Sequence, residues 1–359
     1  MGHYRHEALQ HYAAELLRGV GYPEEPAQVT AAHLVAADVM GHTTHGLALL
    51  PPYLTEADEG RTTLSGHHEV VSDAGAVCVW DGGYRPGVWL TAQAVASAAD
   101  RAAAHGVGIV SVRRCSHIGC LATYLEAATD RGMMVIVSCS DPSVESVAPY
   151  GGTRAVYTPN PIAFGIPTAD SEAAILVDIS ASITTNGMAA RLAQQGGQFP
   201  GAWLQDAAGN PTSDPDAMTP SAFGRTGEAT GTILPVGGVD HGHKGFGLGL
   251  AIEALTQGLS GLGRDGQADQ WGCGVFVQAL DPARFAGAGA FLQATAYLAQ
   301  QCRISPAAPW SEGVRIPGDG ARAHRAAALA DGVPLSPGIM EGLAPWADKL
   351  SVEAPAPIP

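Results

Sequence analysis

The 359-residue chain is 46% hydrophobic, which is enough apolar content for a globular protein of two or three subdomains. Its 19 Lys and Arg residues against 34 Asp and Glu residues give a net charge of −15, so we expect neither a nucleic-acid partner nor a membrane partner. Six scattered cysteines indicate reduced thiols, and the N-terminal stretch has a helical pattern in place of a signal peptide, so we expect a cytoplasmic protein.

The N-terminal part of the chain is helical in pattern. Apolar residues recur on one face over residues 4–18, and a second helix follows to about residue 40. Residues 47–59 predict a bent or restarted helix because they include two adjacent prolines. The small and polar stretch 41–46 (Gly-His-Thr-Thr-His-Gly) interrupts these helices, and we predict that chemistry takes place there.

A second candidate region is a loop in the middle of the chain that contains His117. The pattern predicts strands at 69–72 and 76–80, a turn at 81–83, a helix at 89–105, a buried strand at 107–112, a helix at 121–131 and a strand at 133–139. The last three elements predict a βαβ unit, in which the loop after the first strand lies beside a helix N-terminus. His117 would then face a ligand, and N–H groups freed by Gly119 would approach a phosphate or carbonyl. The alternative is a loop histidine in solvent.

Further candidate residues follow in the second half of the chain. Two prolines bracket Asn160 and hold the backbone extended, which suits either a ligand wall or a plain structural turn. The glycine-rich stretch 237–247 contains Lys244 and predicts a phosphate or cofactor cradle, although it is not a Walker motif. The pattern also predicts a strand at 174–179 that carries Asp178, a short helix from Gly187, an excursion or lid at 199–219, a helix at 248–259, a strand at 274–280 and mostly helical structure beyond.

Several short motifs occur together in a characteristic order. They are Thr44-His45-Gly46 with Tyr53, Ser116-His117-Ile118-Gly119, Ala148-Pro149-Tyr150-Gly151-Gly152, Asn160-Pro161-Ile162-Ala163-Phe164, Asp178-Ile179-Ser180-Ala181-Ser182, His243-Lys244-Gly245-Phe246-Gly247-Leu248 and Ile316-Pro317-Gly318. In this order the chain resembles the malate/L-lactate dehydrogenase family of the second type, which is unrelated to the Rossmann-fold dehydrogenases. That family acts on malate, lactate, sulfolactate and ureidoglycolate, and it includes reductases of cyclic imino acids such as piperideine carboxylate.

The resemblance implies an α/β fold in a homodimer that binds NADH or NADPH. A mixed, largely antiparallel sheet would form the cofactor and catalytic domain at 73–284, packed on a helical domain from both chain ends (1–72 and 285–350), with a flexible tail at 351–359. It implies catalytic roles for His45, His117 and Thr44, substrate contacts by Leu49, Tyr53 and Thr123, and no metal. It implies cofactor contacts by His117, Gly119, Asn160, Asp178, Ile179, Ser180, His243, Lys244, Pro317 and Gly318. This chemistry agrees with the residues, since hydride transfer to a carbonyl or imine leaves charge that a nearby histidine can protonate.

The chain departs from the family pattern around the expected substrate. Leu49 stands where the family has an arginine that pairs with the substrate carboxylate, and Thr44 replaces a serine. The family's Ala-Arg-Gly-Lys stretch becomes Thr185-Asn186-Gly187-Met188, and its Gly-Thr-Asn-Pro becomes Thr158-Pro159-Asn160-Pro161. The loss of charged groups indicates a larger or less charged substrate than a simple 2-hydroxy acid.

These observations lead to one main hypothesis and three alternatives. We expect an NAD(P)H-dependent oxidoreductase that acts on a 2-oxo acid, a 2-hydroxy acid or a related small molecule. A role in a specialised biosynthetic pathway is one interpretation of this activity, and cyclic imine reduction is the first alternative. A cofactor-binding protein without redox turnover is the second. A metal-dependent hydrolase or lyase is the third, prompted by the spacing of Cys115, His117 and Cys120 and of His241 and His243, which fits no closed zinc template. The sequence does not choose between NADH and NADPH.

Overall fold

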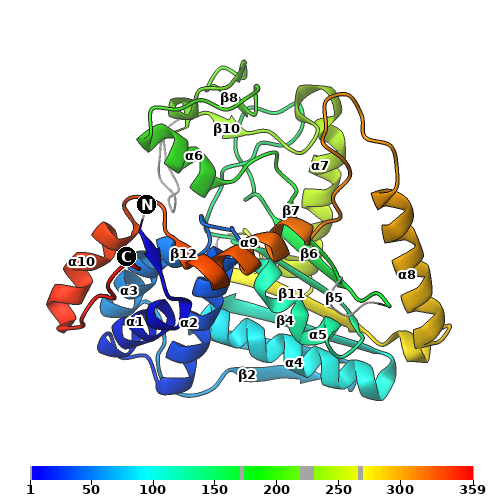
Figure 1. Cartoon of the computed structure of the whole chain (residues 1–359), viewed down its shortest axis with the longest axis horizontal. Coiled ribbons are helices and arrows are strands. Elements are labelled where there is room, and N and C mark those ends of the chain that lie inside the picture. Colours follow the sequence, from blue (N-terminus) through cyan, green and yellow to red (C-terminus); the bar gives the residue numbers. More distant parts are fainter. Residues whose placement is uncertain (1, 170–173, 219–229, 266–269, 359) are drawn as a thin grey trace.

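A seven-stranded sheet forms the centre of the molecule (Figure 1). The computed structural model describes residues 2–169, 174–218, 230–265 and 270–358. The strands lie in the order β2 (Glu69–Asp73), β3 (Val77–Arg85), β4 (Val107–Cys115), β11 (Cys273–Leu280), β5 (Met134–Ser140), β6 (Pro161–Ile166) and β7 (Ile175–Ser180). The pair β3 and β4 is parallel, and the other neighbouring pairs are antiparallel. The prediction of a mixed, largely antiparallel sheet is therefore confirmed.

The middle of the sheet is held by β-branched residues that are buried on both faces. Val277 of β11 pairs with Val110 on one side and with Val137 on the other, and all three are 0% exposed. Burying a valine side chain fully is worth about 1.5 to 3 kcal/mol, and such residues favour the extended backbone. The apolar runs that predicted these strands are thus the same residues that fix their register.

The predicted βαβ unit is wrong in one respect. β4 and β5 run in the same direction, but β11 lies between them and is antiparallel to both. The predicted helix between them is broken into a 3-10 turn, η2 (Leu121–Tyr124), and one short turn of helix, α5 (Glu126–Thr129). A strand from more than a hundred residues downstream cannot be placed by local periodicity, which is why the sequence pattern missed it.

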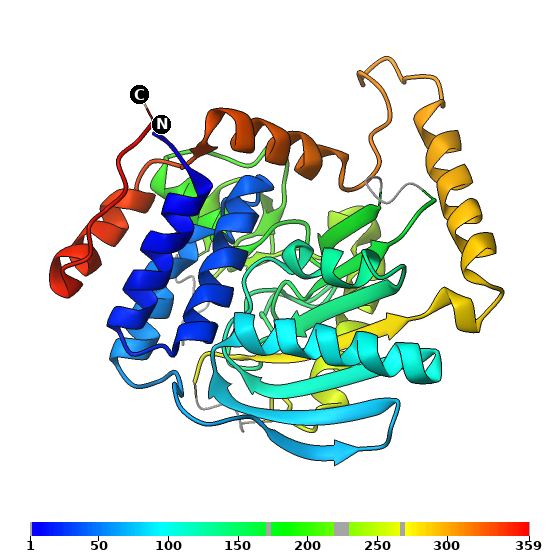
Figure 2. The same cartoon turned by 60° about the horizontal axis from the view of Figure 1, so that its bottom comes forward.

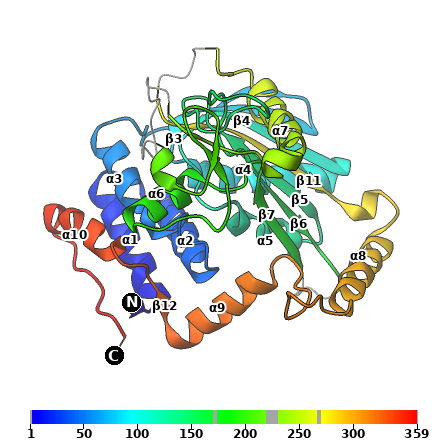
Figure 3. The same ribbon diagram turned by 90° about the horizontal axis from the view of Figure 1, so that it is seen from above.

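Helices from both ends of the chain pack together beside the sheet (Figures 2 and 3). The helices are α1 (His6–Gly19), α2 (Glu24–Val39), α3 (Leu50–Asp58), α9 (Asp319–Asp331) and α10 (Ile339–Leu350), and β1 (His3–Tyr4) pairs with β12 (Val333–Pro334). α4 (Gly87–His105) covers one face of β4 and β11. It packs so closely that a Cβ on Gly108 would lie 1.9 Å from the Ala98 carbonyl oxygen. The fold prediction of a helical layer formed by both chain ends is confirmed.

The remaining elements lie at the periphery. They are η1 (Leu47–Leu49), α6 (Asn186–Gln194), β8 (Leu204–Gln205), β9 (Pro211–Thr212), η4 (Pro215–Ala217), β10 (Thr232–Ile233), α7 (Gly238–Glu253), the π-helical turn η5 (Ala254–Gly258), η6 (Pro282–Arg284) and α8 (Ala288–Arg303). α8 extends along one side of the molecule, away from the helices of the two chain ends (Figures 1 and 2). The division at 1–72, 73–284, 285–350 and 351–359 stays a proposal; β2 spans its first boundary, and within the tail the Ile358 N–H donates to the His3 carbonyl.

The predicted turn at 81–83 and most of the predicted glycine-rich cradle at 237–247 are parts of regular elements. The stretch 81–83 lies inside β3, where the Asp81 carboxylate accepts hydrogen bonds from the Nε atoms of Arg113 and Arg114, each at 2.8 Å. Most of the glycine-rich stretch 237–247 lies within α7 and forms no loop before a helix. Its glycines allow close packing, since a Cβ on Gly245 would lie 2.3 Å from the Val236 nitrogen.

The predicted lid is a small folded unit. Residues 199–218 contain β8, β9 and η4, and β10 joins them to form a three-stranded sheet in the order β10-β8-β9. Its core contains Phe199, Leu204 and Ile233, which are all buried. Residue 219, the last of the predicted lid, lies outside the described part of the chain.

None of the helices in the described part of the chain combines the length and apolar content needed to cross a membrane.

Candidate functional site

A cavity of about 480 Å³ lies where the helices of the N-terminal region meet the sheet and α6. Its wall includes eight of the residues proposed from the sequence, namely Thr44, His45, Leu49, His117, Gly119, Asp178, Ile179 and Ser180. They come from the turn before η1, the loop after β4 and the end of β7. Three segments far apart in the chain therefore converge on one cavity, which is the setting expected of a binding site for a small molecule.

His117 is held by its neighbours so that one ring nitrogen is already occupied. The Gly119 N–H donates to Nδ1 at 3.2 Å, and the Tyr53 hydroxyl lies 2.7 Å from the same atom. The Trp271 ring stacks on the imidazole with centroids 5.0 Å apart. Because Nδ1 accepts a hydrogen bond, neutral His117 carries its proton on Nε2. The expectation that the Gly119 N–H faces a ligand is thus wrong, because this donor binds His117.

His45 lies beside His117, with ring centroids 6.4 Å apart. The Thr44 hydroxyl is 2.8 Å from its Nδ1, so this ring is also held on one side. Burial lowers the pKa of His45 to about 4, helped by the nearby His42 and Arg191, and burial together with His45 lowers the pKa of His117 to about 3. Both imidazoles are therefore neutral at physiological pH.

The turn that carries His45 is fixed by a buried carboxylate. Asp38 Oδ2 accepts a hydrogen bond from the Leu47 N–H at 2.7 Å, at the start of η1. A Cβ on Gly46 would lie 2.3 Å from the Asp38 Cγ, so only glycine fits there. Burial raises the pKa of Asp38 to about 7. Leu49 follows in η1, where its 9% exposed side chain belongs to the hydrophobic core and also lines the cavity.

Asp178 lies opposite, near the end of β7. Its Oδ2 accepts a hydrogen bond from the Ala122 N–H at 2.9 Å and lies 3.6 Å from the Cys120 Sγ. Burial raises the pKa of this carboxyl, and the nearby His42 opposes that effect. A carboxylate at this position can accept hydrogen bonds from hydroxyl groups of a ligand.

The other predicted residues lie outside the cavity wall. Tyr53 stands behind His117, and Thr123 donates to the Cys120 carbonyl at 2.8 Å and lies 2.9 Å from His33 Nδ1. His243 and Lys244 are exposed on α7. Pro317 and Gly318 adjoin the other end of β7, where the Pro317 carbonyl accepts the Leu176 N–H. Asn160 is fully buried and supports the wall from behind.

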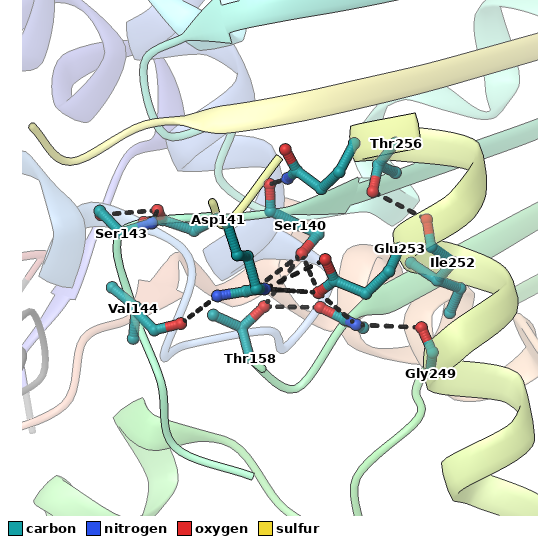
Figure 4. Close-up of polar contacts among 12 residues, drawn as sticks. Ser140, Asp141, Ser143, Val144, Thr158, Gly249, Ile252, Glu253 and Thr256 are labelled. Carbon is teal, nitrogen blue, oxygen red and sulfur yellow. Dashed lines mark hydrogen bonds and ion pairs between the residues drawn. The ribbon is translucent and has the colours of Figure 1, made fainter. Parts of the chain in front are cut away.

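Asn160 belongs to a polar network that holds the end of β5, and Figure 4 shows Ser140, Thr158 and Glu253 of this network. The Asn160 amide donates to Glu253 at 2.9 Å, and the Thr158 hydroxyl donates to the Asn160 oxygen at 2.6 Å. Glu253 also accepts hydrogen bonds from the Ser140 hydroxyl at 2.6 Å and from Arg264 at 2.8 Å. Since Ser140 and Thr158 line the cavity, this network fixes one wall of the site.

Sequence reasoning missed several residues of the wall. They include His42, Asp141, Cys120, Trp203, Trp271 and Thr184. The stretch 41–46 contains two histidines, and this pair was the sequence signal for a site. The prediction used His45 and left out His42. Asp141 and Trp271 follow and precede strands that meet only in the folded sheet, so no local pattern joins them.

The cysteine and histidine residues that have metal-ligand spacing in the sequence do not come together as a metal site in the structure. The Cys115 thiol is buried and points at the Gly87 carbonyl oxygen at 3.8 Å. Among the described residues, one group has ligand atoms close enough for a metal ion, and it consists of His42, Cys120 and Asp178, whose ligand atoms lie within 4.8 Å of one another. The spacing of Cys115, His117 and Cys120 is thus a poor guide to a metal site.

Comparison with known proteins agrees with this architecture. A sequence model of the malate/L-lactate dehydrogenase family matches residues 4–344. The L-lactate dehydrogenase of Cupriavidus necator is 33% identical over 352 residues, which are 96% of each chain. The (2R)-3-sulfolactate dehydrogenase (NADP(+)) of Chromohalobacter salexigens is 30% identical over 314 residues, 85% of this chain and 86% of that one. The structure of a dehydrogenase from Sinorhizobium meliloti has a TM-score of 0.83 at 31% identity and covers 96% of this chain and 97% of its own. The chain therefore belongs to the malate/L-lactate dehydrogenase family.

Proposed function

We propose that the protein is an NAD(P)H-dependent oxidoreductase that moves hydride to or from a 2-oxo acid, a 2-hydroxy acid or a related imine. The observation that carries this proposal is the pair of neutral histidines, His45 and His117, side by side in one cavity. Family membership supports a dehydrogenase, and the name of the Chromohalobacter salexigens relative supports a nicotinamide cofactor. His45, His117 and Thr44 are the proposed catalytic residues.

The residues of the cavity suit such a cofactor. The first turn of α6 borders the cavity through Thr185, Gly187 and Met188. The Met188 N–H donates to the Thr185 hydroxyl, and the positive end of the helix dipole favours phosphate at this N-terminus. The Ser180 hydroxyl and the Asp178 carboxylate line the same wall and can bind ribose hydroxyls. When bound, the nicotinamide would supply or accept the hydride.

The histidines handle the proton that accompanies this transfer. Of the two neutral rings, His45 can accept the hydroxyl proton of a 2-hydroxy acid at Nε2 during oxidation when its Nδ1–H donates to the Thr44 hydroxyl. His117, whose proton is on Nε2, can donate a hydrogen bond to the reacting oxygen. In the opposite direction a protonated histidine returns the proton to oxygen or nitrogen.

The proposal predicts that the purified protein binds NADH or NADPH without added metal. Trp203 and Trp271 line the cavity, so binding should quench tryptophan emission and sensitise emission from the reduced nicotinamide. Met188→Glu places a negative charge at the first turn of α6 and should weaken binding at least ~10-fold, because phosphate and carboxylate repel each other there. The control is Gln194→Glu, which makes the same change at the exposed far end of α6. Failure of both cofactors to bind at millimolar concentration would sink the proposal.

Imine reduction is the second candidate, and one observation favours it. Among the described residues that line the cavity, none is a lysine or arginine that would pair with a second carboxylate, and Leu49 occupies the family's arginine position. A protein that binds the cofactor but turns over no acid or imine would correspond to the alternative without redox activity.

We also propose that the protein is a homodimer that uses α8. Tyr297 and Leu298 on this helix are 64% and 62% exposed, and Ile304 just after it is 64% exposed, which is unusual for an apolar surface of a monomer. Light scattering should give a mass twice that of the 36.7-kDa chain. Leu298→Glu should shift the mass to that of a monomer, whereas Gln301→Glu, at an exposed polar position of the same helix, should not. A monomeric unmodified protein would contradict the proposal.

A further inference from the structure

Three side chains with metal-binding atoms meet in one part of the cavity wall. His42, Cys120 and Asp178 come from the turn after α2, the residue before η2 and the end of β7, and all three line the cavity. One ligand atom of each residue lies within 4.8 Å of the ligand atoms of the other two. Since these segments are far apart in the sequence, it is the fold that brings an imidazole, a thiol and a carboxyl group together.

The spacing of these atoms suits a tetrahedral metal ion. Zinc bonds of about 2.0 Å to nitrogen or oxygen and about 2.3 Å to sulfur place neighbouring ligand atoms roughly 3.3 to 3.6 Å apart. The Cys120 Sγ already lies 3.6 Å from the Asp178 Oδ2. The His42 ring makes no hydrogen bond within the described part of the chain, so none has to break when the ring moves closer to a metal.

The charge of this group favours a divalent cation that also binds sulfur. Without a metal, the Cys120 thiol donates its hydrogen to the Asp178 carboxylate. A metal ion takes the place of this hydrogen, which leaves as a proton, so the ion acquires a thiolate, a carboxylate and an imidazole as ligands. The two anionic ligands balance a charge of +2, and the cavity lining, as far as it is described, contains no lysine or arginine to repel the ion.

We propose that His42, Cys120 and Asp178 bind zinc or a similar sulfur-binding divalent ion, with the fourth position of the ion open to the cavity. The proposed hydride transfer uses no metal, so the ion inhibits the protein, because its ligand Asp178 is the carboxylate that can bind the cofactor ribose. The metal site rests on the three side chains alone. The competition with the cofactor rests on the proposed function.

The metal site is tested by titrating the full chain, first stripped of metal by a chelator, with Co²⁺ while the absorption spectrum is recorded. A tetrahedral cobalt ion on a thiolate should give a sulfur-to-cobalt charge-transfer band, and Zn²⁺ should remove the band by displacing cobalt. Cys120→Ser should abolish this band, and His42→Gln should weaken zinc binding by at least ~10-fold. Mg²⁺, which prefers octahedral oxygen ligands, should not displace cobalt.

The matched control is Cys139→Ser, which makes the same change at another buried thiol of the cavity wall. It should keep the cobalt spectrum of the unmodified protein, because Cys139 is outside the group of ligands. A band that persists in Cys120→Ser, or that is lost in a Cys139→Ser protein with unchanged thermal unfolding, would put the metal on another thiol and overturn the inference. The absence of any such band from the unmodified protein would overturn it as well.

The competition is tested by titrating NADH at a series of zinc concentrations and recording the nicotinamide emission. In the unmodified protein and in Cys139→Ser, the apparent Kd of NADH should rise in proportion to the zinc concentration, and in Cys120→Ser it should rise far less. Bound zinc that leaves the Kd of NADH unchanged would refute the inhibitory role. If neither NADH nor NADPH binds to the metal-free protein, the proposed function is rejected, and the cobalt spectra still decide the metal site.

Discussion

Replacing His117 or His45 by alanine is expected to lower kcat by ~10²- to 10⁴-fold, which is the usual contribution of a general acid or base. Both rings line the cavity and are oriented by hydrogen bonds, His117 by Gly119 and Tyr53 and His45 by Thr44. Neither histidine belongs to the hydrophobic core, so each substitution should lower the melting temperature only slightly while it lowers kcat strongly. The measurement is steady-state turnover on the best substrate beside thermal unfolding of each variant.

The control for this experiment is His11→Ala, an exposed histidine on α1 far from the cavity wall. It should leave both rate and stability unchanged. If the variants of His45 and His117 both kept the rate of the unmodified protein, neither histidine would be the proton carrier. A fall in stability as large as the fall in rate would indicate a structural role.

The depressed pKa values give the same experiment a pH dependence. Oxidation needs the neutral imidazole, and the pKa of His45 is lowered to about 4 and that of His117 to about 3. Plots of kcat/KM for oxidation should therefore stay flat from pH 8 to well below 6.5, where a solvent-exposed histidine would already be protonated. The unfolded chain binds protons on these two histidines more readily than the folded protein does. The free energy of unfolding should therefore decrease as pH falls from 6.5 toward the lowered pKa values of the folded state.

Replacing Leu49 by arginine is expected to raise kcat/KM toward pyruvate or oxaloacetate by ~10- to 100-fold, the range of a partly desolvated ion pair. Leu49 lines the cavity at the position where the resemblance to the family implies a carboxylate-binding arginine, and none of the described residues that line the cavity is a lysine or arginine. An arginine would give the carboxylate two parallel donors. The gain should be largest for oxaloacetate, which carries the second negative charge.

Leu49→Met is the matched control, since it keeps an apolar side chain of similar volume and should not improve either acid. The measurement compares pyruvate, oxaloacetate and a cyclic imino acid for all three proteins. Efficient oxidation of malate by the unmodified protein would show that the site does not depend on a cation at this position. If Leu49→Arg destabilised the fold, its melting temperature would be lower, and thermal unfolding of the variant would show this independently of the activity measurement.

Local sequence patterns predicted most of the helices and strands, because hydrophobic periodicity and the residues that end an element lie within the element or next to it. α1 and α4 begin and end within about two residues of their predicted bounds, and α2 ends close to its predicted end, since a 3.6-residue apolar period and flanking Gly or Pro mark a helix. Asp81 and its two glycines were misread as a turn because their partners, Arg113 and Arg114, lie on another strand. The same limit applies to residues 237–247, where Gly245 packs against Val236.

The site was predicted in part, and chiefly through the resemblance of short motifs to a family. That resemblance brought together Thr44, His45, His117 and Asp178, which do line one cavity, whereas Lys244 lies elsewhere. Their roles stay predictions until the variants are measured. Composition and spacing alone gave no reason to notice Asp141, because its place in the cavity wall depends on how the end of β5 packs in the folded sheet.

The position of β11 has a consequence for the order in which the molecule forms. The sheet consists of two three-stranded halves, β2-β3-β4 and β5-β6-β7, and Cys273–Leu280 is the strand that joins them. During synthesis the two halves emerge first and each presents an open edge, which is prone to pairing with other chains. Contacts between such distant segments make folding slow. The walls that carry His117 and Ser140 therefore meet only after β11 has joined the two halves of the sheet.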